Sequence, residues 1–214
     1  MDTIIFDIDG TLTDTEYAST ETLHKVLLEE TGRDYNREEL RAYFGIPAVE
    51  TIERIGVPDV ARVVKRWSDA FCELCEQEVR LFEGIAPLLE ELRRREVKLG
   101  LVSSKTREQY ARTFQRLGFD DAFVQIICAD LTEKHKPYPE PIEKFFELTG
   151  LPKQGAVYIG DTVHDCACAH GAGIAFGLAG WGCLHPEGID AEYKFEHPHE
   201  VLSLLSHEPA KPAV

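Results

Sequence analysis

The chain has 214 residues, of which 43% are hydrophobic and 29% are charged, and its formal net charge is −15. This composition is ordinary for a globular protein and excludes a fibrous or intrinsically disordered chain. A surface this acidic repels nucleic-acid phosphates and anionic lipids, so neither a nucleic acid nor a membrane is expected as a partner.

Predicted strands and helices alternate over most of the chain. Short apolar, β-branched runs predict buried strands at residues 3–8, 97–102, 124–128, 156–159 and 174–178. Apolar residues spaced by three and four predict helices at residues 87–95, 107–117, 139–149 and 163–170. Strands that alternate with helices predict an α/β fold, in which a Rossmann-like parallel sheet is covered on both faces.

Residues 15–81 interrupt this alternation, because they contain no convincing strand. The apolar side chains of residues 60–79 fall on one helical face. A helical segment of about 65 residues is too long for a loop. We therefore predict an all-helical cap domain at residues 15–81, inserted into a core made of residues 1–14 and 82–214, with linkers near residues 13–15 and 81–84.

The first predicted strand leads into Asp7-Ile8-Asp9-Gly10-Thr11. Extended backbone would place Asp7 and Asp9 on the same side, and Gly10 permits a turn. Two crowded carboxylates repel each other unless a proton or a cation joins them. The run therefore favours a hard divalent cation with oxygen ligands, and a solvated turn is the alternative.

The fourth predicted strand ends in a similar way, with Gly160-Asp161-Thr162, and Asp165 lies one helical turn further on. The carboxyl ends of parallel strands meet at one edge of a sheet, which is where α/β sheets carry their sites. Asp161 is therefore expected near Asp7, although Asp161 or Thr162 could instead cap the following helix.

Two further segments suit a phosphate group. Ser103 and Ser104 follow the second predicted strand, where hydroxyls and free backbone N–H groups can bind phosphate or cap a helix. Lys136 lies in a stretch with Pro137 and Pro139, which restrict the backbone. A cation fixed there would offset the charge of a phosphoryl group.

Taken together and in this order, the four segments resemble the motifs of the haloacid dehalogenase-like superfamily. The resemblance covers residues 3 to about 205, and the helical insert resembles the first cap class (C1) of that superfamily. The stretch Lys136-Pro137-x-Pro139-x-Pro141 and the turn Gly180-Trp181-Gly182 are similar to those of phosphoglycolate phosphatase-like members. The β-phosphoglucomutase-like members share the four motifs and the cap class.

The resemblance implies a Mg²⁺-dependent phosphatase that acts on a small phosphorylated metabolite, phosphoglycolate-like or a sugar phosphate. Asp7 would form an aspartyl-phosphate, and Asp9 would act as general acid and base. The Asp7 carboxylate, the Asp9 main-chain carbonyl and Asp161 would hold the Mg²⁺. The phosphoryl oxygens would be bound by Ser103, Ser104 and Lys136.

The resemblance also implies roles for Asp165 and for a turn of the cap. Asp165 would either bind the metal through water or orient Lys136. In relatives with this cap, a turn after a cap helix reaches the leaving group of the substrate. The corresponding turn here contains Phe44, Gly45 and Ile46.

Three alternative functions remain at this point. A phosphomutase needs a basic residue in the cap for a second phosphate; the turn at residues 44–48 has none, although Arg41 and Arg54 lie nearby. Inorganic pyrophosphatase activity belongs to the same reaction class. A non-catalytic phosphate-ligand binding protein would be expected to lack one of the acidic or basic motif residues.

The location of the protein is predicted from two absences. No run reaches the roughly 20 apolar residues that span a bilayer, and the N-terminus has no basic, cleavable leader. A cytoplasmic protein is expected, with its six cysteines present as reduced thiols.

Overall fold

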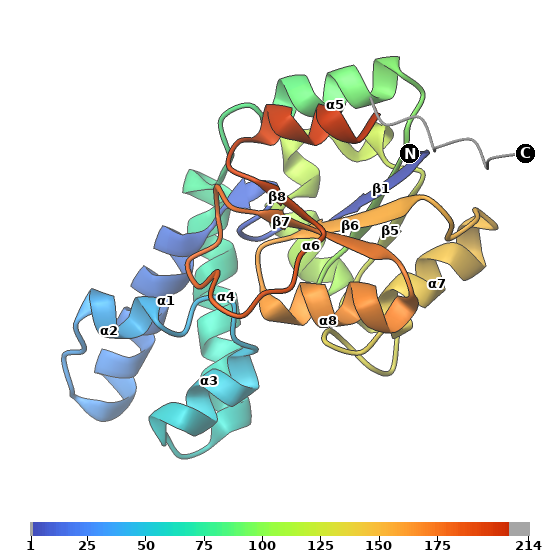
Figure 1. Cartoon of the computed structure of the whole chain (residues 1–214). Helices are drawn as coiled ribbons and strands as arrows, with labels where there is room; N and C mark the ends of the chain where they lie inside the picture. Colours follow the sequence, from blue (N-terminus) through green and yellow to red (C-terminus); the bar gives the residue numbers. More distant parts are fainter. Residues whose placement is uncertain (1, 206–214) are drawn as a thin grey trace, which may run out of the picture.

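The computed structural model describes residues 2–205 and contains a six-stranded sheet between layers of helix (Figure 1). The spatial order of the strands is β5-β4-β1-β6-β7-β8, and every neighbouring pair is parallel. Their bounds are Thr3–Phe6 for β1, Lys98–Val102 for β4, Gln125–Ile127 for β5, Ala156–Gly160 for β6, Ala175–Ala179 for β7 and Tyr193–Phe195 for β8. The predicted α/β fold with a parallel sheet is confirmed.

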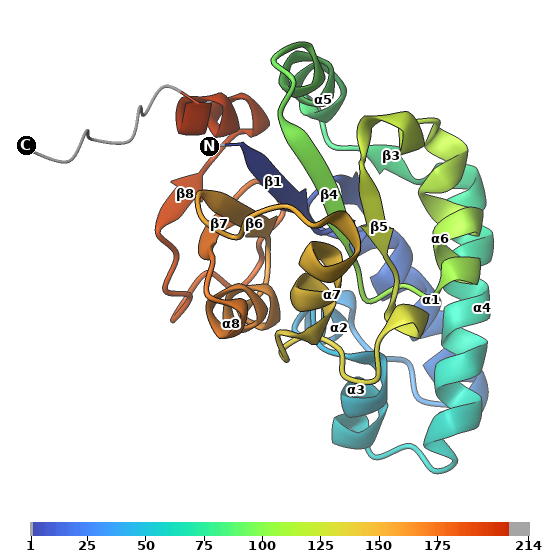
Figure 2. The same cartoon turned by 90° about the vertical axis from the view of Figure 1, so that its right-hand side faces the viewer.

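Successive side chains of each strand point to opposite faces of the sheet. On one face, Ile4 and Phe6 join the apolar cluster formed with α5 (Ile85–Arg94), α6 (Arg107–Thr113) and the 3₁₀ segment Pro198–Leu205. On the other face, Ile5 belongs to the cluster of α7 (Glu140–Thr149) and α8 (Val163–Ala172) (Figure 2). The core therefore consists of two apolar layers.

Gly100 of β4 allows α7 to pack directly on the sheet. A Cβ atom at this position would lie 2.3 Å from the Phe145 ring of α7. Only a residue without a side chain fits there, so the glycine in the middle of this strand is explained by close helix packing.

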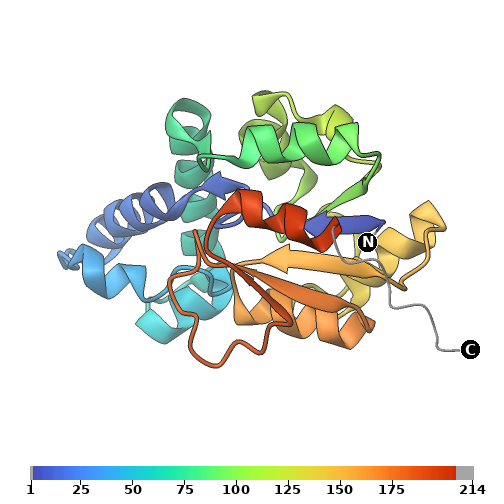
Figure 3. The same ribbon diagram turned by 45° about the horizontal axis from the view of Figure 1, so that its top comes forward.

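The helical insert lies beside the sheet as a group of four helices (Figures 1 and 3). They are α1 (Glu16–Thr31), α2 (Arg37–Arg41), α3 (Ala48–Ile55) and α4 (Val60–Glu78). They share an apolar cluster of their own, which includes Leu23, Leu27, Leu40, Ile52, Val63 and Trp67. Glu30 of α1, whose side chain is buried, pairs with Arg62 and Arg66 and so fixes α1 against α4. This group therefore buries its own hydrophobic surface.

Two short strands join the insert to the sheet region. β2 (Thr13–Asp14) and β3 (Arg80–Leu81) pair in antiparallel fashion. The linkers predicted near residues 13–15 and 81–84 therefore lie side by side. Neither these two-residue strands nor the edge strand β8 was predicted, because runs this short show no periodic pattern.

Several helix boundaries differ from the prediction, among them the end of α8, which lies at Ala172 rather than at residue 170. α5 begins at Ile85, two residues before the predicted start, because Pro87 lies in the first turn, where a backbone N–H has no partner within the helix. The helix predicted for residues 107–117 ends at Thr113 and is followed by a 3₁₀ turn at Gln115–Leu117. None of the helices in the described residues is long and apolar enough to cross a membrane.

Candidate active site

The loop after β1 is held in place by three close backbone contacts. Gly10 has a φ of +75°, and a Cβ there would lie 2.2 Å from a carboxylate oxygen of Asp161. A Cβ on Gly182 would lie 1.8 Å from the Gly10 carbonyl oxygen. The Trp181 indole N–H donates to the Thr11 carbonyl oxygen at 2.8 Å. The Gly180-Trp181-Gly182 turn therefore packs directly against this acidic loop.

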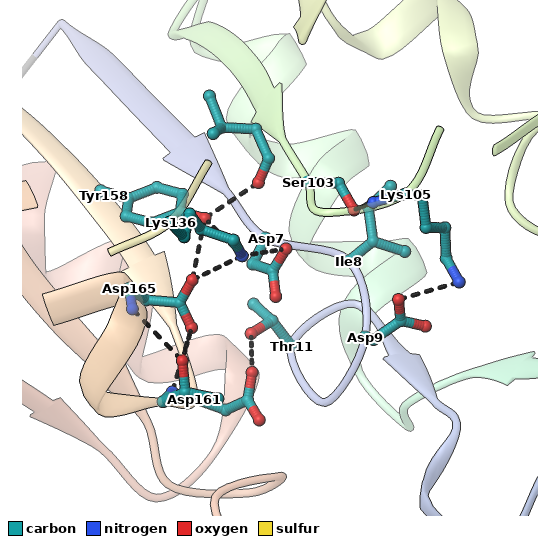
Figure 4. A network of polar contacts seen from close by, with 12 residues as sticks. Asp7, Ile8, Asp9, Thr11, Ser103, Lys105, Lys136, Tyr158, Asp161 and Asp165 are labelled. Carbon is teal, nitrogen blue, oxygen red and sulfur yellow. Dashed lines mark hydrogen bonds and ion pairs between the residues drawn. The ribbon is translucent and has the colours of Figure 1, made fainter. Parts of the chain in front are cut away.

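Three carboxylates meet at the carboxyl edge of the sheet (Figure 4). Asp7 follows β1, whereas Asp161 and Asp165 lie at the junction of β6 and α8. One oxygen of each lies within 4.8 Å of the others, and the exposed fractions of the three residues are 6%, 4% and 0%. The three carboxylates lie close together because β1 and β6 are neighbours in a parallel sheet and end at the same edge.

A single ammonium group lies inside this cluster. The Lys136 Nζ is 2.9 Å from Asp7 Oδ1 and 2.6 Å from Asp165 Oδ1. Asp165 also accepts hydrogen bonds from the Tyr158 hydroxyl and from the backbone N–H and hydroxyl of Thr162. Thr162, rather than Asp161, is the N-cap of α8. The Asp161 carboxylate accepts only from the Thr11 hydroxyl, at 3.0 Å, among the contacts of the described residues.

The pKa values of the three carboxyl groups are shifted in different directions by burial and by neighbouring charges. Burial, together with the charges of Asp165 and Asp9, raises the pKa of Asp7 from 3.8 to about 7, although Lys136 opposes this rise. Burial and the charges of Asp165 and Asp7 raise the pKa of Asp161 well above its ordinary value. Burial also acts on Asp165, but Lys136 and the donors of Thr162 outweigh it and lower its pKa. The cluster thus needs another cation if Asp7 and Asp161 are to be ionised together.

Asp9 does not join this cluster. Its Oδ2 lies 2.8 Å from the Nζ of Lys105, and its buried Oδ1 has no hydrogen-bond partner in the described structure. Asp7 and Asp9 therefore have different ammonium partners, although the charge of Asp9 still raises the pKa of Asp7. β1 ends at Phe6, so both residues lie in a loop, and Asp165 is a further carboxylate near Asp7.

Lys105 is a buried residue of the site that sequence reasoning missed. It is 5% exposed, and its Nζ lies 4.5 Å from the centroid of the Phe71 ring. Burial alone would lower the pKa of Lys105, but the charge of Asp9 outweighs it and raises the pKa. Its position directly after Ser103 and Ser104 in an acidic chain was a usable signal, of the same kind as the one that identified Lys136.

Ser103 and Ser104 line the same cavity as Asp7. Ser103 is buried, and its hydroxyl accepts a hydrogen bond from the Lys105 backbone N–H at 3.3 Å, whereas Ser104 is exposed. The alternative that these serines cap the next helix is not observed. The N-cap of α6 is Thr106, which forms a capping box with Gln109.

The cavity has a volume of about 440 Å³ and lies between the acidic cluster and the helical insert. Phe44, Gly45 and Ile46 all line it, as do Trp67 and Phe71 of α4. A Cβ on Gly45 would lie 2.9 Å from the Thr162 side chain, so the turn of the insert approaches the end of β6 closely. The sequence pattern alone assigns Trp67 and Phe71 only to the apolar face of their helix.

The fold and the site together define an α/β enzyme with an acidic centre at the carboxyl edge of a parallel sheet and a helical insert above it. Residues 4–179 match the sequence profile described as haloacid dehalogenase-like hydrolase. The chain belongs to this family, as its four motifs predicted. Members of the family that are phosphatases generally use a divalent metal, and the buried aspartate cluster is present here.

Curated relatives and solved structures agree with this assignment. The chain is 30% identical to pyrophosphatase PpaX of Oceanobacillus iheyensis, over 95% of this chain and 96% of the relative. It is 28% identical to pyrophosphatase PpaX of Halalkalibacterium halodurans, over 96% and 97%. A provisionally assigned phosphoglycolate phosphatase from Lactobacillus plantarum has a TM-score of 0.88 at 29% identity, covering 95% and 98% of the two chains. CbbY from Rhodobacter sphaeroides, solved with phosphate, shares the fold with a TM-score of 0.80 at 24% identity, covering 97% and 100%.

Proposed function

We propose that this hydrolase is a Mg²⁺-dependent phosphatase that cleaves a small phosphomonoester through an aspartyl-phosphate on Asp7. The observation that carries the proposal is the buried cluster of Asp7, Asp161 and Asp165 around Lys136, on the floor of a cavity. Such an arrangement places a carboxylate nucleophile beside a fixed cation, which is what attack on an anionic phosphorus centre requires.

The donor set fits a hard divalent cation, which prefers oxygen ligands. The carboxylates of Asp7 and Asp161 and the main-chain carbonyl of Asp9 would hold it. Asp161 in particular is buried without an ammonium partner among the contacts of the described residues. Bound Mg²⁺ would neutralise carboxylate and phosphate charge and act as a Lewis acid on the phosphoryl group.

The side chains of the cluster suggest the following roles. Asp7 attacks phosphorus, so that an Asp7–phosphorus bond forms while the bond to the leaving oxygen breaks. Asp9 gives a proton to that oxygen and later takes one from the water that releases phosphate. Ser103, Ser104 and Lys136 bind the phosphoryl oxygens. Asp165 accepts from Lys136 at 2.6 Å and so orients it, which supports the second of the two roles considered for Asp165.

We further propose that residues 15–81 act as a cap that covers the cavity and excludes bulk water. The close approach of Gly45 to Thr162 supports this role. Phe44, Gly45 and Ile46 would contact the leaving group of the substrate. The six cysteines are free thiols, which supports the proposed cytoplasmic location.

Pyrophosphate hydrolysis is the second candidate function, because the curated relatives described above are named pyrophosphatases. It uses the same nucleophile and the same metal site. A phosphomutase is less well supported, because neither Arg41 nor Arg54 lines the cavity. A purely binding role is not favoured, since all the acidic and basic motif residues are present.

The test is the hydrolysis of p-nitrophenyl phosphate by the wild-type protein and by Asp7→Asn, with and without Mg²⁺. We expect metal-dependent turnover that is lost in the variant. The exposed substitution Asp121→Asn serves as the control and should retain activity. Equal turnover by the wild-type protein and Asp7→Asn would refute Asp7 as the nucleophile, and turnover that is insensitive to chelation would refute the metal.

A further inference from the structure

The cavity has two chemically different halves. The floor is formed by the sheet region and holds the charged groups, whereas the wall opposite belongs to the helical insert. Among the described residues that line the cavity, those of the insert include no charged side chain. The insert contributes apolar and aromatic groups, namely Tyr43, Phe44, Ile46, Pro47, Ala48, Val49, Trp67 and Phe71, and a few hydroxyls.

The two lysines that line the cavity already have anionic partners. Lys136 is held between Asp7 and Asp165. The Lys105 ammonium is paired with Asp9 on one side and covered by the Phe71 ring on another. Neither ammonium is therefore available for a second anionic group on the substrate.

The nearby arginines of the insert are also engaged. Arg41 pairs with Glu16 and Glu38, and Arg54 pairs with Glu50. Neither arginine lines the cavity.

The leaving group must extend toward this uncharged wall. In phosphoryl transfer the attacking and leaving oxygens lie roughly in line with phosphorus, so the leaving group points away from Asp7 on the floor. A carboxylate or second phosphate on it would lose water against Phe44, Ile46 and Phe71, where the insert offers no basic side chain; the two histidines that line the cavity, His135 and His164, belong to the floor. Such a charge is strongly disfavoured in apolar surroundings.

The volume of the cavity points the same way. Its 440 Å³ falls within the roughly 300–1,000 Å³ of pockets that hold drug-sized organic ligands. A ring on the leaving group would cover the aromatic wall beside the phosphoryl group.

We propose that the substrate is the phosphate ester of an uncharged alcohol that carries an apolar, ring-sized group, packed against Phe44, Trp67 and Phe71. This inference rests on the proposed phosphatase function and names its substrate class. The buried hydroxyl of Thr15, which also lines the cavity and has no hydrogen-bond partner in the described structure, would pair with the ester oxygen or with a second hydroxyl of such an alcohol.

The first test compares matched substrates with the wild-type enzyme and Mg²⁺. Benzyl phosphate and 4-carboxybenzyl phosphate differ by one carboxylate on the ring. We expect kcat/KM to be roughly 100-fold higher for the uncharged ester, and pyrophosphate to be cleaved less efficiently than benzyl phosphate. Equal or faster cleavage of the carboxylated ester or of pyrophosphate would overturn the inference.

The second test changes the wall. Ile46→Arg introduces a cation there, and Ile46→Gln introduces a neutral polar side chain of similar length. Leu28→Arg adds the same charge on the exposed surface of α1, outside the cavity. Only Ile46→Arg should lower the benzyl to carboxybenzyl ratio, by about tenfold or more. An unchanged ratio in Ile46→Arg would contradict the placement of the leaving group against this turn.

Binding measurements separate this inference from the proposed function. If p-nitrophenyl phosphate is not hydrolysed, the phosphatase proposal fails, but the preference of the cavity can still be measured. Titration calorimetry with benzylphosphonate and 4-carboxybenzylphosphonate, in the presence of Mg²⁺, needs no turnover. Tighter binding of benzylphosphonate would support the uncharged class, and equal or tighter binding of the carboxylated compound would refute it.

Discussion

Replacing the proposed nucleophile should stabilise the metal-free protein at neutral and alkaline pH. In the folded state the pKa of Asp7 is raised from 3.8 to about 7, chiefly by burial. Between these values the unfolded chain releases the Asp7 proton, whereas the folded protein keeps it. Stability therefore falls as pH rises through this window, by about 1.36 kcal/mol per pH unit and by about 4 kcal/mol in total. Asp7→Asn removes this penalty.

Urea unfolding in the presence of a chelator measures the effect. The free energy of unfolding should be determined for the wild-type protein and for Asp7→Asn at several values between pH 5 and pH 8. At pH 5 the wild-type protein has already lost part of this stability, so the advantage of the variant should grow by about 3 kcal/mol up to pH 8. Asp121→Asn, at an exposed position, provides the matched control.

If the difference in the free energy of unfolding between Asp7→Asn and the wild-type protein does not change with pH, the reasoning is refuted. The loss of stability arises from a proton that Asp7 holds only in the folded state. Added Mg²⁺ offers an independent check. It should stabilise the wild-type protein by about 2.7 kcal/mol at 100 times its dissociation constant. The gain in Asp7→Asn should be smaller, because one carboxylate ligand is missing.

Three other substitutions test separate contacts. Lys105→Met leaves the Asp9 carboxylate without its ammonium partner. It should lower kcat on an alkyl phosphate by about tenfold to a hundredfold. The loss on p-nitrophenyl phosphate should be smaller, because its leaving group needs no general acid. Gly45→Ala should raise KM and lower the free energy of unfolding by about 1–2 kcal/mol. The φ of this residue is +83°, and a Cβ there would meet the Thr162 side chain. Unaltered kinetics would show that this contact plays no part in cap closure. Trp181→Phe loses the indole donor to the loop after β1 and should destabilise by about 1 kcal/mol in urea unfolding.

Sequence reasoning predicted that the residues of the candidate site come together, because parallel strands end at one edge. Asp7, Ser103 and Asp161 follow β1, β4 and β6, and these three strands are neighbours in the order β4-β1-β6. Their side chains come together wherever such a sheet forms. Lys136 follows no strand directly, so its place beside Asp7 was expected only from the family resemblance.

The contacts that could not be predicted from the sequence join residues that lie far apart in the chain. Lys105 meets Asp9 across 96 positions and Phe71 across 34, and no local pattern encodes either contact. Trp67 was interpreted correctly as buried, but a helical period gives the apolar face without saying whether a neighbour or a cavity lies against it. The β2–β3 pair escaped notice for the same reason, because pairing of two-residue strands is set by tertiary contact.

The charges of the site explain how so acidic a protein could accept a phosphate ester. Four carboxylates, of Asp7, Asp9, Asp161 and Asp165, surround two ammonium groups, so two negative charges remain when all are ionised. A dianionic phosphoryl group would meet net repulsion there, and one divalent cation would just cancel the surplus. Each lysine thus fixes the position of a carboxylate, and the affinity for phosphate should depend mainly on the metal. If the metal and Lys136 bind the phosphoryl group, as proposed, no unpaired lysine of the cavity lining remains for the rest of the substrate, and the uncharged wall of the insert is the consistent counterpart.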